Sequence, residues 1–290
     1  NDVIPVTITF SEAVTVTGTP QLTLETGSSD AVVNYSSGSG SNTLTFNYTI
    51  ATGHATSDLD YTATNSLALN GGTIKDGAGN TSVLTLASPG ATNSLGANKA
   101  LVVDGVVATV SSVSSTISDG TYKTNDVIPI TITFSEAVTV TGTPQLTLET
   151  GTNDAVVNYA TGSGSSILTF YYTVSSGHSS SDLDYVSTSA LALNSGTIKD
   201  AAGNTSTLTL ASPGATNSLG ANKAISIDTV TPTIASVSST SSNGNYKVGD
   251  VIPITVTFSE AVTISGTPQL TLETGSSDAM VNYSSGSGST

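Results

Sequence analysis

Carboxylates are the residues of this chain whose type and spacing suit chemistry best. The sequence holds 21 Asp and Glu residues against six Lys and no Arg, which gives a net charge of −15. Several of these acids stand in polar turns between uncharged stretches, such as Asp58 and Asp60, and Asp200 at the start of Asp-Ala-Ala-Gly-Asn. Because Ca²⁺ takes six to eight oxygen ligands from carboxylates, carbonyls and water, acidic loops that meet in space would bind calcium.

The same acids also have an interpretation without a metal. Asp residues in turns hydrogen-bond their own backbone, and Glu136 would then simply be solvated. The segment 200–204 lacks the alternating acidic spacing of an EF-hand loop, and a turn with Gly203 at positive φ explains it equally well. Both interpretations remain open on the sequence alone.

Histidine offers the other chemistry to consider, and it argues against catalysis. The chain has two histidines, His54 and His178, which occupy the same position in two copies of one repeat. No Gly-x-Ser-x-Gly elbow accompanies them, and neither has a second His nearby in the sequence for a triad or a zinc site. We therefore expect a protein that is not an enzyme.

The elements that must position the acids are β-strands. Apolar residues alternate with polar ones, as at Ile4, Val6, Ile8 and Phe10, which is the period of a half-buried strand. Turn signals such as Asn70-Gly71-Gly72 separate these runs. In the complete copy the pattern predicts strands near 109–116, 127–134, 144–149, 155–159, 167–174 and 185–193, and an interrupted one over 206–228. Segment 211–224 has no clear assignment.

An internal repeat organises these strands. The run Asn1-Asp2-Val3-Ile4-Pro5 returns 124 residues later at 125–129, and a close copy follows at 249–253. Residues 1–124 and 125–248 are identical at 92 of 124 positions. We therefore predict an all-β fold of tandem immunoglobulin-like β-sandwich repeats with a 124-residue period, since about seven short strands per copy are typical of such sandwiches. The predicted repeats are 1–104 (truncated at its N-terminus), 105–228 (complete) and 229–290 (truncated at its C-terminus).

Strand direction predicts where the acids gather. Alternating strands place every second loop at the same end of a sandwich, so acids of neighbouring repeats should meet at the joints between them. At the first joint the predicted calcium ligands are Asp2, Asp58, Asp60, Asp104, Glu136 and Asp200. At the second joint they are Asp126, Asp182, Asp184, Asp228 and Glu260.

Several motifs resemble the bacterial Ig-like tandem repeats of giant cell-surface and adhesin-like proteins. They are Gly249-Asp250, the run from Ile252 through Phe258-Ser259-Glu260-Ala261-Val262, Ile198-Lys199-Asp200-Ala201-Ala202-Gly203-Asn204, and Ile227-Asp228-Thr229-Val230-Thr231-Pro232. The chain is similar in this to the repeats of cyanobacterial swimming-motility surface proteins and of RTX-type adhesin stalks. The first linker departs from the pattern, with Gly105 in place of Thr and Ala108 in place of Pro, which predicts a looser first joint.

Composition and the resemblance limit the classes of partner and the cellular location that we expect. An acidic chain without arginine is a poor ligand for nucleic acid, which is bound by neutralising phosphates. No apolar run approaches the ~20 residues of a membrane helix, and zero cysteines leave no disulfide framework. The resemblance implies an extracellular, bacterial cell-surface protein that acts as a structural stalk or spacer, with adjacent repeats of the same chain as its partners. The alternative is a self-assembling filament, sheath or matrix protein, whose partners are other copies of itself.

Overall fold

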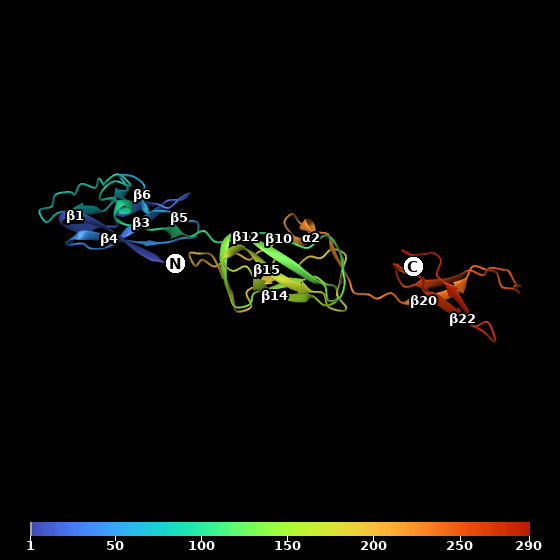
Figure 1. Cartoon of the computed structure of the whole chain (residues 1–290). Coiled ribbons are helices and arrows are strands. Elements are labelled where there is room, and N and C mark those ends of the chain that lie inside the picture. The colour runs from blue at the N-terminus through green and yellow to red at the C-terminus, as the bar shows by residue number, and fades with distance from the viewer. Residues whose placement is uncertain (1) are drawn as a thin grey trace.

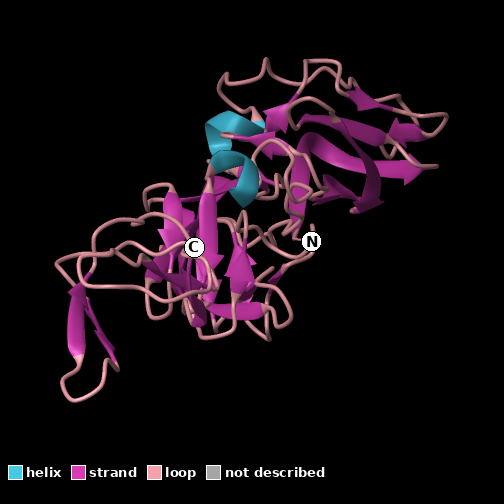
Figure 2. Ribbon diagram, turned by 90° about the vertical axis from the view of Figure 1, so that its right-hand side faces the viewer, coloured by secondary structure: helices cyan, strands magenta, loops and turns pink. Residues whose placement is uncertain are grey.

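The computed structural model describes residues 2–290 and confirms an all-β chain, with 44% of residues in strands and 3% in helices. Figure 1 shows three groups of strands that follow one another along the chain, and Figure 2 shows strands dominating the molecule. We call the strands within residues 3–104 the first body, those within 110–228 the second body, and those within 234–282 the third segment.

The second body is built on one curled antiparallel sheet. Its strands are β10 (Val110–Ser115), β11 (Gly120–Tyr122), β12 (Val127–Thr141), β13 (Gln145–Leu148), β14 (Ala155–Thr161), β15 (Ser165–Thr173), β16 (Ser179–Ser180), β17 (Leu191–Ala192), β18 (Thr197–Lys199) and β19 (Ile225–Asp228), with a short helix α2 (Leu219–Asn222). The order in the sheet is β10-β12-β15-β14-β13-β17, and β18 pairs with the far end of β12. A separate three-stranded sheet, β11-β19-β16, includes the parallel pair β11 and β19.

The first body has a closely similar arrangement. Its elements are β1 (Val3–Thr17), β2 (Gln21–Glu25), β3 (Ala31–Ser37), β4 (Ser41–Thr49), β5 (Ala55–Thr56), β6 (Asp60–Tyr61), β7 (Leu67–Ala68), β8 (Thr73–Lys75), α1 (Leu95–Asn98) and β9 (Val103–Asp104). Strands β1 and β4 pair from Val3↔Thr49 through Thr9↔Thr43, and β12 and β15 pair at the positions 124 residues higher. The alternating apolar pattern predicted these central strands correctly.

Two strand predictions were wrong. The strand predicted near 127–134 was expected to end there, but β12 continues to Thr141, pairing with β15 as far as Thr133 and with β18 from Thr139. The register shifts between Thr133 and Val138, so a bulge absorbs the polar residues that interrupt the alternation. The single strand expected over 185–193 is also absent, because that stretch forms only β17 and one isolated bridge at Tyr185.

Each body encloses its own apolar core. In the second body the inward residues of β12 and β15 are at most 2% exposed, and these are Ile128, Ile130, Ile132, Phe134, Leu168, Phe170 and Tyr172. Burying each such side chain stabilises the fold by roughly 1.5–3 kcal/mol. In the first body Ile4, Ile8 and Phe10 are only partly buried, because no strand of residues 2–290 covers β1 where β10 covers β12.

The third segment differs from the two bodies. It consists of two two-stranded sheets, β20 (Ile234–Ser239) with β21 (Ile254–Phe258) and β22 (Gln269–Leu272) with β23 (Ala279–Asn282). From residue 229 to residue 290 no hydrophobic side chain is buried. Across the described residues 2–290, neither short helix is long or apolar enough to span a membrane.

Candidate metal site at the first joint

Three carboxylates meet where the first body joins the second. Asp104 ends β9, Glu136 lies in the bulge of β12, and Asp200 opens the loop after β18. One carboxylate oxygen from each lies within 4.8 Å of the other two. The group therefore combines a linker residue with two residues of the body that follows.

A tight turn positions Asp200. Its carboxylate accepts the backbone N–H of Asn204 at 2.8 Å and the Asn204 side-chain N–H at 2.9 Å. Gly203 in this turn has φ +91°, as the sequence predicts for a turn that requires positive φ. Asp200 is 3% exposed, so this ordered loop holds a nearly buried carboxylate facing the joint.

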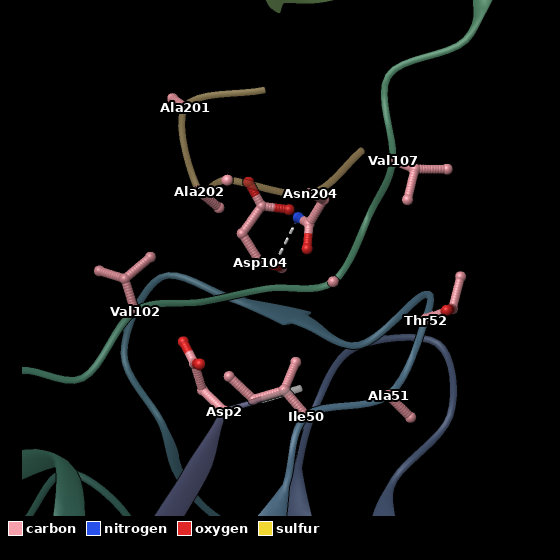
Figure 3. A pocket seen from close by; sticks show the side chains of 12 residues that line it. Asp2, Ile50, Ala51, Thr52, Val102, Asp104, Val107, Ala201, Ala202 and Asn204 are labelled. Carbon is pink, nitrogen blue, oxygen red and sulfur yellow. Dashed lines mark hydrogen bonds between the residues drawn. The ribbon is translucent and has the colours of Figure 1, made fainter. Parts of the chain in front are cut away.

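Asn204 also ties the turn to the linker. Its side-chain nitrogen lies 2.9 Å from the carbonyl oxygen of Asp104 and 3.4 Å from that of Val106. Asn204 and Asp104 line a hollow of about 580 Å³ together with Asp2 of the first body, and Figure 3 shows the Asn204 amide pointing at the Asp104 segment. The sequence indicates only a turn for Asn204, because a side chain that bonds a segment 100 residues earlier leaves no local signal.

The three carboxylates repel one another. Burial raises the pKa of Glu136 above its usual value, and the nearby charges of Asp200 and Asp104 raise it further. The two ion pairs among residues 2–290 are Lys123–Asp126 and Lys223–Asp119, so no lysine is paired with this group. A cation at this position would remove the repulsion.

Asp58 and Asp60, also predicted at the first joint, belong to a different cluster. A Cβ built on Gly96 would lie 3.0 Å from a carboxylate oxygen of Asp60 and 3.3 Å from one of Asp58. Asp60 accepts the backbone N–H of Gly90 at 2.9 Å. Burial acts to raise the pKa of Asp60, but hydrogen bonds from the backbone and from Ser94 outweigh it and hold this pKa below its usual value.

Asp182 and Asp184 repeat that arrangement in the second body. A Cβ on Gly220 would lie 3.0 Å from Asp184 and 3.3 Å from Asp182, and Asp184 accepts the N–H of Gly214 at 2.9 Å. These acids anchor the segment 211–224, which the sequence left without an assignment. Ser218, the N-cap of α2 that accepts the Ala221 N–H, was the local signal that could have placed it.

The other acids predicted for the second joint form no group of three metal-binding side chains among residues 2–290. Asp126 bonds the N–H of Lys123, which together with the Lys123 ammonium lowers its pKa. Asp228 accepts the Val230 N–H at 3.0 Å. Glu260 has a buried Oε1 without a hydrogen-bond partner among residues 2–290.

Comparisons of the chain with protein-family models, with curated proteins and with solved structures find no match. The class of site therefore rests on geometry alone. It is a carboxylate cluster at a joint, built from oxygen donors of the type that hard divalent cations prefer.

Proposed function

We propose that this chain belongs to the extracellular stalk of a large bacterial surface protein or adhesin, as a non-catalytic spacer with joints stiffened by calcium. In this proposal residues 1–104, 105–228 and 229–290 are successive immunoglobulin-like β-sandwich repeats. The 124-residue sequence repeat and the equal strand registers of β1 and β12 support it. Repeats of this kind contact mainly their neighbours along the chain, which suits a protein that provides reach.

The carboxylate group at the first joint carries the proposal. Asp104, Glu136 and Asp200 would supply up to six oxygens if each bound in bidentate fashion, and water would complete the six to eight that Ca²⁺ requires. Because Asp104 is the last strand residue of the first body and the other two lie in the second body, an ion would bind both sides of the joint at once. It would thereby favour the docked arrangement over a bent one.

The test is calcium binding by the 290-residue chain, measured by titration calorimetry and by thermal melting with calcium or chelator. We expect a weak site of the ~10⁻⁴–10⁻³ M class. At about 100 times the dissociation constant, binding stabilises by about 2.7 kcal/mol, which should raise the melting temperature of the second body by at least about 5 °C. Glu136→Gln and Asp104→Asn should abolish both the heat and the shift.

Glu12→Gln is the matched control. Glu12 occupies the position of Glu136 in the first body but is exposed, and it belongs to no group of three metal-binding side chains among residues 2–290. This variant should bind calcium as the wild type does. If the wild type shows neither heat of binding nor a change in melting temperature, the carboxylates serve only the turns.

The alternative function, a self-assembling filament or sheath, also has a supporting observation. The edge of β1 along Val6–Phe10 has no strand partner within residues 2–290, whereas β12 pairs there with β10. Open edges pair with further strands, either from a preceding part of a longer chain or from a second copy. Sedimentation velocity separates the two functions, because a spacer stays monomeric at high concentration and a filament protein assembles.

A further inference from the structure

Each body holds a histidine against a buried tyrosine close to its exit linker. In the first body the Tyr48 hydroxyl lies 2.8 Å from Nδ1 of His54, and the two rings stack at 5.8 Å with an interplanar angle of 19°. In the second body Tyr172 and His178 repeat this at 2.9 Å, 5.8 Å and 21°. Neither pair takes part in the proposed calcium site.

The protonation states follow from the surroundings. Burial raises the pKa of Tyr172 to about 12, so its hydroxyl stays protonated and is able to donate. The backbone N–H of Ser175 also points at Nδ1 of His178, at 3.4 Å. With two donors directed at it, Nδ1 is the unprotonated nitrogen of the ring. The imidazole is thus fixed in both position and tautomer.

The backbone beside each histidine holds the linker. In the first body the Gly53 N–H donates to the Gly105 carbonyl at 2.8 Å, and the Gly105 N–H donates to the His54 carbonyl at 2.7 Å. A Cβ on Gly105 would lie 2.3 Å from the carbonyl oxygen of Ala51. The linker therefore approaches this loop too closely for any residue but glycine in this arrangement.

The second linker makes the same contact with different atoms. The Thr229 hydroxyl donates to the His178 carbonyl at 2.8 Å and accepts the Gly177 N–H at 3.0 Å. A side chain has replaced the backbone groups of Gly105, yet the loop still holds the linker through the same two positions. The contact is kept where the linker residue changes, which indicates that the contact itself matters.

The strand that follows each histidine pairs with the strand that carries an acid of the linker. The residues just after His54 form β5, which pairs with β9 so that Ala55 faces Asp104. After His178, β16 pairs with β19 so that Ser179 faces Asp228. We propose that the Tyr48–His54 and Tyr172–His178 pairs are latches that hold each exit linker against its body and position Asp104 and Asp228 at the joints. The effect on calcium rests on the proposed function, whereas the latch itself does not.

The latch is tested without calcium by hydrogen exchange of the 290-residue chain. Tyr172→Phe keeps the buried ring and removes only the hydroxyl. Losing this one hydrogen bond should speed exchange of the Gly177 amide by about five- to tenfold, while the Gly105 amide at the unchanged first joint keeps its rate. His178→Ala should produce the same local effect, and His178→Gln, which retains an acceptor, should restore protection in part.

Tyr171→Phe is the control, because Tyr171 is 52% exposed on the same strand. The latch is overturned if the Gly177 amide exchanges at the same rate in the Tyr172→Phe and Tyr171→Phe variants. It is also overturned if Tyr172→Phe speeds exchange equally throughout the second body. The Tyr48→Phe variant is also titrated with calcium, and its calcium affinity at the first joint should be several-fold lower than that of the wild type. If the wild type binds no calcium but Gly177 responds as expected, the latch stands and only the proposed calcium function fails.

Discussion

Glu136 is half-buried in the bulge of β12, beside two other acids. Its raised pKa means that the folded chain binds the proton of the Glu136 carboxyl group more tightly than the unfolded chain does. Stability from Glu136 is therefore fully present below the unfolded value of about 4.3 and is lost as the pH rises through the folded value. Without calcium, Glu136 should destabilise the second body at neutral pH.

Denaturant unfolding in chelator at two pH values measures this loss. At pH 7 Glu136→Gln should be more stable than the wild type, and near pH 4 the difference should shrink towards zero. Calcium should reverse the order at pH 7, because only the wild type gains from the ion. The same change at Glu12 should have little effect at either pH. A Glu136→Gln variant that is less stable in chelator at pH 7 would contradict the repulsion at this site.

Among the elements, the turn between β14 and β15 depends on two glycines with different surroundings. Gly162 has φ +113°, and a Cβ there would lie 2.1 Å from the carbonyl oxygen of Ile167. Gly164 has φ +85° with nothing within 4 Å. Gly164→Ala should cost about 1–2 kcal/mol for the left-handed backbone alone. Gly162→Ala should cost about 2–5 kcal/mol, because the clash adds to that strain.

Equilibrium unfolding of the two variants gives the difference directly. Gly38 and Gly40 provide a replicate in the first body, since a Cβ on Gly38 would also lie 2.1 Å from a carbonyl oxygen, that of Thr43, and Gly40 is open. Equal losses at Gly162 and Gly164 would show that the turn relaxes and that the close approach is unimportant.

The elements also show how far sequence alone can reach. Period-two alternation predicted β12 and β15 because every second side chain of these strands points into the core and is apolar. It failed over 185–193, where Tyr185 is buried by a loop and its hydroxyl bonds the carbonyl of Ala211. The same limit applies to the site. Alternating strand direction predicted that Asp104, Glu136 and Asp200 meet at one joint, and they do. It could not place Asp58 and Asp60, because they face a loop without any periodic pattern in its sequence.

At the scale of the whole molecule, the side chain of Asn204 links the second body to the end of the first. Gly105 and Ala108 predict a loose linker, whereas the Asn204 bonds to Asp104 and Val106 act against this. Asn204→Ala should widen the spread of distances between spin labels placed on the two bodies. Asn80→Ala is the control, since within the part of the chain that the structure describes the Asn80 side chain donates to Asp76 of its own turn, at 2.7 Å, and to no other residue.

Pulsed electron spin resonance in chelator provides those distances. The Asn80→Ala distribution should match that of the wild type, and calcium should narrow the wild-type distribution. If Asn204→Ala leaves the distribution unchanged, the linker itself or other contacts determine the angle, and Asn204 serves only its own turn.

The parallel pairing of β11 with β19 has a mechanical consequence. Strand β10 begins at the linker from the first body, and β19 ends at the linker to the third segment (Figure 1). A pull on the chain that runs along these strands would move β10 and β19 in opposite directions. The bonds of β10 to β12 and of β19 to β11 and β16 would then be loaded together in shear rather than opened one at a time. Such a body yields only when several hydrogen bonds break at once, so a string of them would carry force while each remained folded.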